Sequence, residues 1–269
     1  MTTYCVRTGT VVRVQFPLQG ADMTGLIRVG REAGIVSLFL NRPERRNALS
    51  LALLAELSEA LTDEVREDTN AVILSGVNGY FSAGGDLADM TGTPADLRID
   101  DAIEEVTRKI QELPVPVIAA IDGPCMGGAF DLALSCDHRI AAKDSFFQVP
   151  AARLGLLYNP RAIVRMRQRL GRDGVFRVLV LGERLDAAEA LAAGVVSHVV
   201  EGPSHAAALE IAQAAEGNIR SAVGATKHLL NAIDSMHYDP EEWEERRREM
   251  MSSPDREKAV IKEKKRRGY

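Results

Sequence analysis

The sequence predicts an α/β fold with a mostly parallel sheet and a helical final third. Three observations support this prediction. Short segments rich in β-branched and large apolar residues alternate with longer segments of helical periodicity. Several of the short segments carry apolar residues on both faces, as parallel strands do when helices cover both faces of their sheet. Beyond about residue 200 only helical patterns remain.

Five segments are predicted strands. The clearest are GIVSLFL, which is dense in β-branched and large apolar residues, and AVILSG, which is typical of a buried strand. The five cover residues 34–40, 71–76, 116–123, 138–142 and 195–200. Their alternation with helices predicts one continuous α/β unit rather than two independent folds.

The predicted helices lie between and after these strands. Ser50 is the expected N-cap of the first, in which leucines recur at helical spacing from Leu53 to Leu61. The second covers residues 96–112 and ends before Pro114. The remaining helices are expected at 161–170, 174–181, 186–193, 204–216, 219–235 and, highly charged, from about 240 onward.

We expect three parts in the 269 residues. Residues 1–24 are an N-terminal extension of uncertain structure, residues 25–200 form the α/β core, and residues 201–269 form a helical C-terminal segment. The length is ample for a substantial core.

Composition excludes several classes of protein. The formal net charge of −5 argues against a dedicated nucleic-acid binder, and no apolar run approaches the roughly 20 residues that span a bilayer. The N-terminus lacks a secretory pattern. Cys5, Cys125 and Cys136 are too few and scattered for a disulfide framework or zinc site. We therefore expect a cytoplasmic protein without a bound metal.

Two stretches share the order buried strand, glycine-rich turn, helix. They are AVILSG followed by FSAGGDLADM, and PVIAAIDG followed by PCMGGAFDLALSCD. Glycine lets a ligand approach the backbone closely, and the first N–H groups of a helix lack internal acceptors. Two such turns side by side could offer two N–H donors to one oxygen, an oxyanion hole. The alternative is two tight turns, with Asp86 capping a helix. Neither stretch matches a P-loop or GxGxxG.

Asp131 is a single carboxylate within the apolar run MGGAFDLALSCD. Burial of an unpaired carboxylate costs several kcal/mol. Because no partner is evident nearby in the sequence, a catalytic role is favoured over a structural one. Apolar surroundings would raise its pKa and a helix N-terminus would lower it.

Five ordered segments resemble the enoyl-CoA hydratase/isomerase (crotonase) superfamily, from about Ile27 to the C-terminus. They are LNRPERRNALS (40–50), FSAGGDL (81–87), PVIAAIDG (116–123), GGAFDLALSCD (127–137) and DAAEALAAGVV (186–196). The resemblance implies a crotonase-like spiral of ββα units, assembled as trimers or dimers of trimers. It implies that the C-terminal segment serves in oligomerisation and covers the active site. It also implies an acyl-CoA substrate, with no cofactor beyond the coenzyme A moiety.

The same resemblance implies roles for particular residues. The backbone N–H groups of Gly85 and Gly128 would bind the thioester oxygen and stabilise an enolate beside it. The implied substrate and coenzyme A contacts are Arg46, Ala83, Gly85, Asp86, Leu87 and Gly127. The C-terminal KEKKRR could meet adenosine phosphates, although a solvated helix end is the commoner explanation for such a charge run.

The reaction depends on side chains around these turns. Hydratases of the superfamily usually carry two glutamates, whose positions are occupied here by Asp131 and Ala151. Two-carboxylate hydration is therefore disfavoured. Dienoyl-CoA isomerases have an aspartate at the Asp131 position, but they carry further acids where this chain has Ala151 and Asn159.

A local resemblance points to decarboxylation. GGAFDLALSCDHRIAA and LGLLYNP are similar to bacterial methylmalonyl-CoA decarboxylases, which share Tyr158 and Asn159 but have glutamate at position 131. In those enzymes the tyrosine is implied to orient the leaving carboxylate. Alternatively, Tyr158 and Asn159 shape a turn before Pro160.

We therefore expect a crotonase-superfamily lyase or isomerase with Asp131 and Tyr158 as catalytic residues, and decarboxylase-like or single-acid isomerase-like chemistry. One alternative is a hydratase or isomerase whose missing acid is Asp89, Glu104 or Glu105. Another is a non-catalytic relative that binds RNA or protein through its basic C-terminus.

Other candidate residues carry less weight. His138 and His198 lie in or beside strands, and Cys125 and Cys136 have no evident histidine partner. We interpret all four as structural.

Overall fold

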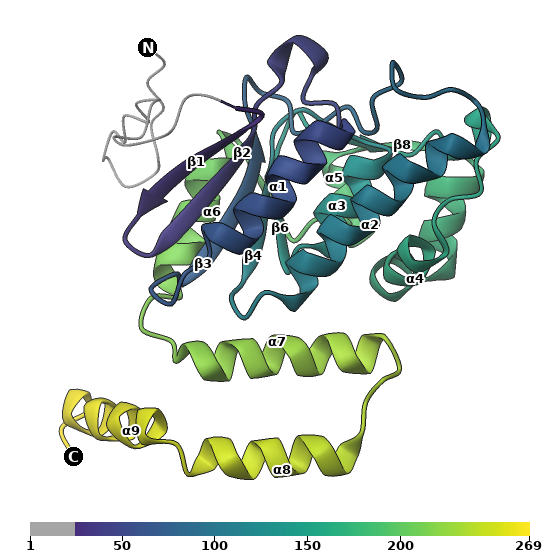
Figure 1. Cartoon of the computed structure of the whole chain (residues 1–269). Coiled ribbons are helices and arrows are strands. Elements are labelled where there is room, and N and C mark those ends of the chain that lie inside the picture. The colour runs from purple at the N-terminus through teal and green to yellow at the C-terminus, as the bar shows by residue number, and fades with distance from the viewer. Residues whose placement is uncertain (1–24) are drawn as a thin grey trace.

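The computed structural model describes residues 25–269, and the predicted N-terminal extension lies outside them. Its main sheet has the strand order β1-β2-β3-β4-β6-β9 (Figure 1). The bounds are β1 (Ile27–Glu32), β2 (Ile35–Leu40), β3 (Ala71–Gly76), β4 (Val117–Ile121), β6 (His138–Ala142) and β9 (His198–Val200). Neighbouring strands are parallel except for the β1–β2 hairpin. The predicted mostly parallel α/β fold is confirmed.

Four strands were not predicted from the sequence. One is β1, and the others form a second sheet, β5 (Pro124–Met126), β7 (Phe146–Gln148) and β8 (Arg184–Asp186). The strands of the second sheet have three residues each, too few to show a period of two, and β1 carries polar residues along its length.

The helices largely follow the predicted ranges. They are α1 (Leu51–Asp63), α2 (Leu97–Glu112), α3 (Gly128–Ser135), α4 (Pro160–Val175), α5 (Ala187–Ala192), α6 (Ser204–Ala214), α7 (Arg220–Asp234), α8 (Pro240–Met251) and α9 (Pro254–Arg266). Short 3-10 turns occur at Pro43–Arg45, Pro94–Asp96 and Ala151–Leu154. Ser50 caps α1 as predicted, since its Oγ accepts from the Leu53 N–H at 3.2 Å.

One helical region confirms its predicted division and another differs from expectation. The segments predicted at 161–170 and 174–181 are separated within α4 by the non-helical Gly171 (φ 67°, ψ 179°), and the second continues into a π-helical turn at Phe176–Val180. The charged helix predicted from 240 is divided in two. Ser253 accepts a hydrogen bond from the Arg256 N–H, and Pro254 begins α9, so these residues stop one helix and start the next.

The sheet is covered on both faces (Figure 1). On one face α1, α2 and α3 pack against the larger apolar core, which contains Leu38 and Leu40 of β2. On the other face α6 buries Ala208 and Ala212 against Ile73 of β3 and its neighbours. Because side chains alternate along a strand, this two-sided burial explains why the central strands carry apolar residues on both faces. None of the described helices is both long and apolar enough to cross a membrane.

Polar side chains attach α7 to the core. Lys227, 6% exposed, donates to the carbonyl oxygens of Ile110 at 2.8 Å and Val115 at 3.0 Å, and its Nζ lies 2.8 Å from Asp137 Oδ2. The Ile110 carbonyl belongs to the last turn of α2, where carbonyls lack acceptor partners within the helix. In contrast, α8 and α9 contain no buried residue.

We expect Lys227→Met to lower the free energy of unfolding by about 3 kcal/mol, because it leaves Asp137 and two carbonyls without their cationic partner. Urea unfolding followed by circular dichroism measures the change. Lys143→Met is the matched control, since Lys143 pairs with Glu201 on the surface and its loss should change stability little. Equal stability of the two variants would contradict this role for Lys227.

Candidate active site

The two glycine-rich turns lie side by side. They follow β3 and β4, which are adjacent and parallel, so both chains leave the sheet at the same edge. Ser82 pairs with Cys125 in a parallel bridge. The Ser82 N–H donates to the Pro124 carbonyl at 3.0 Å, and the Met126 N–H donates to the Ser82 carbonyl at 3.1 Å. The turns are therefore joined by backbone hydrogen bonds.

Glycine is required at position 84 by this close approach. Gly84 has φ +86°, and a Cβ there would lie 2.5 Å from the Met126 carbonyl oxygen. An L-residue would be strained by its dihedral angle and would also push the turns apart. The packing of the two turns thus depends on the absence of a side chain at position 84.

Gly85 and Gly128 present the backbone N–H groups that sequence analysis singled out. Within residues 25–269 neither N–H donates to a backbone carbonyl. Gly128 is the first residue of α3, where an N–H has no acceptor inside the helix. A Cβ on Gly128 would lie 2.5 Å from Ile103 Cδ1, so α2 packs against this turn. The arrangement leaves two donors free to bind an external acceptor.

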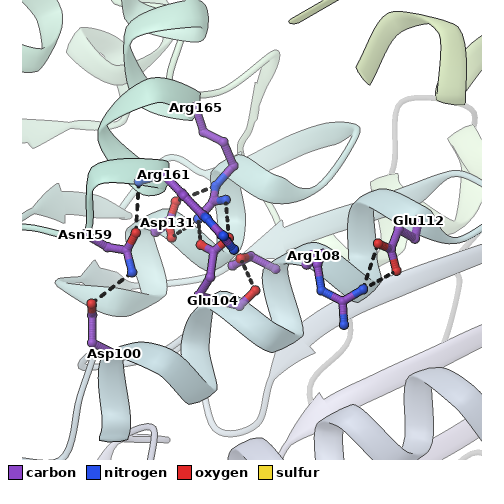
Figure 2. A network of polar contacts seen from close by, with 9 residues as sticks. Asp100, Glu104, Arg108, Glu112, Asp131, Asn159, Arg161 and Arg165 are labelled. Atoms are coloured by element: carbon purple, nitrogen blue, oxygen red, sulfur yellow. Dashed lines mark hydrogen bonds and ion pairs between the residues drawn. The ribbon is translucent and has the colours of Figure 1, made fainter. Parts of the chain in front are cut away.

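Asp131 has a partner, and the interpretation of it as an unpaired acid was wrong. The carboxylate is 2% exposed and accepts from Arg165 of α4, with Nε 3.1 Å from Oδ1 and Nη2 2.7 Å from Oδ2 (Figure 2). Burial raises the pKa of Asp131 above its ordinary value, Arg165 opposes this, and the nearby Glu104 and Asp100 carboxylates add to it. Burial and the two neighbouring carboxylates therefore outweigh Arg165, so Asp131 binds a proton more readily than an exposed aspartate does.

Arg165 also binds Glu104 of α2. Nη2 lies 2.7 Å from Oε2 and Nη1 lies 3.3 Å from Oε1 of Glu104, while Arg161 approaches the same carboxylate at 3.7 Å. Beside them, Asn159 Nδ2 donates to Asp100 Oδ2 at 2.9 Å. Sequence reasoning missed Arg165, because only the packing of α2, α3 and α4 brings these groups together (Figure 2).

Of the three alternative acids, only Glu104 joins this group. Glu105 is exposed and accepts from the Ser58 hydroxyl at 3.2 Å, and Asp89 is exposed. Ala151, at the position of the second hydratase glutamate, is 5% exposed and begins a 3-10 turn.

Tyr158 and Asn159 both have structural contacts. The Tyr158 hydroxyl donates to the Gly127 carbonyl at 2.9 Å, next to the turn of Gly128. Burial, with the nearby Asp131 carboxylate, raises the pKa of Tyr158 well above its ordinary value, so the hydroxyl stays protonated. Asn159 is the N-cap of α4, because its Oδ1 accepts from the Arg161 N–H at 2.9 Å. Asn159 thus caps the helix that Pro160 begins, and the roles of Tyr158 and Asn159 in the reaction stay predictions.

The residues expected to contact coenzyme A surround the first turn. Arg46 is exposed with φ +52°, and its carbonyl accepts from the Ala83 N–H at 3.0 Å. Asp86 is 5% exposed and forms an ion pair with Arg42, while Leu87 is 67% exposed. Although burial opposes ionisation, the Ala88 N–H and Arg42 lower the pKa of Asp86. The ionised Asp86 carboxylate thus orders the first glycine-rich turn.

The remaining candidate residues form no catalytic group of their own. His138 and His198 contact each other with ring centroids 5.0 Å apart, and Cys125 and Cys136 are buried.

No set of three or more histidine, cysteine, aspartate or glutamate residues within 25–269 could bind a metal ion. A cavity of about 690 Å³ lies beside α7, and its lining, which includes Lys227, contains none of the predicted site residues.

The sequence of this chain is similar to known proteins along most of its length. The profile of the enoyl-CoA hydratase/isomerase family matches residues 30–266. The chain is 32% identical over 207 residues to a probable enoyl-CoA hydratase of Mycobacterium tuberculosis, covering 77% of this chain and 82% of that protein. It is 32% identical over 216 residues to the human mitochondrial Delta(3,5)-Delta(2,4)-dienoyl-CoA isomerase, covering 75% of this chain and 66% of that protein.

Solved structures give the same result for the fold. An enoyl-CoA hydratase from Bacillus anthracis has a TM-score of 0.81 at 30% identity, covering 90% of this chain and 97% of that one. An enoyl-CoA hydratase/carnithine racemase from Magnetospirillum magneticum has a TM-score of 0.83 at 27% identity, covering 90% of this chain and 92% of that one. The predicted crotonase-like fold is confirmed.

Proposed function

Because the chain belongs to the enoyl-CoA hydratase/isomerase family, we propose that it moves a proton within an acyl-CoA substrate, using Asp131 as the single acid–base group. The thioester oxygen binds between the Gly85 and Gly128 N–H groups. Arg46, Asp86 and Leu87 line the approach of the coenzyme A moiety. No cofactor beyond that moiety is required.

The proposed reaction is the isomerisation of a 3-enoyl thioester to a 2-enoyl thioester. The Asp131 carboxylate takes a proton from the carbon next to the thioester, and the electron pair of that C–H bond passes into a dienolate. The negative charge on its oxygen is stabilised by two N–H donors, each worth about 3–4 kcal/mol. Asp131 then returns the proton to the far carbon of the dienolate, and the double bond moves into conjugation.

The observation that carries this proposal is the buried Asp131 carboxyl close in the chain to the free Gly128 N–H, without an acid at position 151. Asp131 lies on the first turn of α3, three residues after Gly128, and the position of the second hydratase acid is Ala151. Proton return to a second carbon needs only one group that is first a base and then an acid. Addition of water benefits from a second acid, which Ala151 cannot supply.

A panel of coenzyme A thioesters tests the proposal, with Tyr158→Phe as a discriminating variant. We expect interconversion of 3-enoyl and 2-enoyl thioesters, followed by absorbance. Tyr158→Phe removes one hydrogen bond to Gly127, worth about 1 kcal/mol, and should reduce kcat only about fivefold.

Other outcomes would replace the proposal. Carbon dioxide release from a branched malonyl-CoA, with a much larger loss in Tyr158→Phe, would favour the decarboxylase chemistry that the local resemblance suggests. Rapid hydration of crotonyl-CoA would favour a hydratase. Salt-dependent RNA binding without acyl-CoA affinity would favour a non-catalytic relative. Assembly as a trimer or dimer of trimers and a cytoplasmic location stay predictions.

A further inference from the structure

Asp131 and Glu104 share one arginine. Nη2 of Arg165 lies 2.7 Å from Asp131 Oδ2 and 2.7 Å from Glu104 Oε2, so a single guanidinium nitrogen bridges the two carboxylates (Figure 2). The second oxygen of each carboxylate also accepts a hydrogen bond from Arg165. Asp131 Oδ1 accepts from Nε, and Glu104 Oε1 accepts from Nη1. An arginine fork can contact two carboxylates in this way because its donors lie in one rigid plane.

The three groups differ in their access to solvent. The side chain of Asp131 is 3% exposed, that of Arg165 is 9% and that of Glu104 is 14%. An ion pair at this depth is less screened than a surface pair, and its loss leaves a costly buried charge. The contacts of Arg165 therefore constrain the carboxylate of Asp131 strongly.

We propose that Arg165 is a positioning residue for Asp131 and that Glu104 is the second carboxylate of this site, acting on Arg165 rather than on the substrate. This inference rests on the proposed function for its kinetic consequences. Arg165 donates to both oxygens of Asp131 and thereby fixes the orientation of the carboxylate. Glu104 holds the adjacent edge of Arg165, formed by Nη1 and Nη2, and supplies a second negative charge from α2.

The charged and titratable groups around Asp131 come from α2, from α4 and from the segment that precedes α4. Glu104 and Asp100 approach from α2, Arg165 approaches from α4, and Tyr158 precedes α4. Arg165 favours the carboxylate form of Asp131, whereas Glu104 and Asp100 disfavour it. Removal of Arg165 and removal of Glu104 should therefore change the pKa of Asp131 in opposite directions.

The test measures this pKa directly, without turnover. Aspartate is labelled with carbon-13 at the carboxyl carbon, the Asp131 signal is assigned by its loss in Asp131→Asn, and its chemical shift is followed against pH. We expect the Asp131 pKa to rise by about one pH unit or more in Arg165→Gln, and to fall in Glu104→Gln. Glu112→Gln is the matched control, because Glu112 lies on the same helix and pairs with the exposed Arg108.

Arg165→Lys separates charge from positioning. Lysine restores the cation but not the planar fork. We expect its Asp131 pKa to lie closer to the wild-type value than in Arg165→Gln. Its kcat should nevertheless stay at least about tenfold below wild type, with KM within threefold, because orientation is lost while binding is kept.

The outcomes distinguish this inference from the proposed function. Opposite pKa changes without turnover of any thioester would retain the positioning role and overturn the isomerase proposal. Turnover by the wild type, with the Asp131 pKa unchanged or moved the same way in both glutamine variants, would overturn the inference. Full recovery of kcat in Arg165→Lys would also overturn it, since charge alone would then suffice.

Discussion

Asp131→Asn is expected to lower kcat by about 10²–10⁴-fold, the usual contribution of an acid–base group. Asparagine has nearly the same shape but cannot accept and return the substrate proton. The variant should remain folded, because Glu104 still pairs with the buried Arg165. Steady-state kinetics on a 3-enoyl thioester measure the loss, and circular dichroism checks the fold.

Asp89→Asn is the control for this experiment. Asp89 lies in the first glycine-rich stretch and is exposed, with no contact to Arg165 in the described structure. We expect its kcat to equal that of the wild type. Wild-type turnover in a folded Asp131→Asn protein would show that the acid–base group lies elsewhere, and a loss in Asp89→Asn would identify a candidate for it.

Gly128→Pro should reduce kcat by about 10²–10³-fold, because it deletes one of the two N–H donors proposed for the thioester oxygen. Proline is tolerated at the first position of a helix, where its missing N–H has no internal acceptor. Gly128 occupies that position in α3. The loss should therefore appear in kcat for the isomerisation, while thermal unfolding verifies that the protein is folded.

Gly128→Ala shows how much of this loss comes from added bulk. Alanine keeps the N–H but introduces a Cβ directed at Ile103 Cδ1, 2.5 Å away. The terminal methyl of Ile103 must shift, so some activity should be lost. The alanine variant should nevertheless remain far more active than the proline variant. Equal activity of the two would mean that the Gly128 N–H does not stabilise the transition state.

Much of the fold could be predicted because its signals are local. Strand β3 is a continuous apolar run, and Ser50 caps α1 through its own side chain. The adjacency of the two glycine-rich turns was also within reach, since turns after neighbouring parallel strands leave the same edge of the sheet. The short strands β5, β7 and β8 were missed because three residues carry no period and their pairing comes from distant segments.

The electrostatics of the site could not be predicted in the same way. Arg165 is 34 residues from Asp131 and 61 residues from Glu104. On α4 alone, Arg165 is one of several arginines in the segment PRAIVRMRQRLGRDGV, and nothing in the pattern separates it from Arg167 or Arg169. Only the crossing of α2, α3 and α4 selects it.

The amino-acid sequence therefore specifies the family, the layered α/β fold, the two glycine-rich turns and Asp131, because strand and helix periods and glycine positions act over short stretches of chain. Tertiary structure decides the environment of Asp131. Charge interactions depend on distance and burial in space, and three helices place Arg165 and Glu104 beside a carboxylate that has no charged partner close to it along the chain.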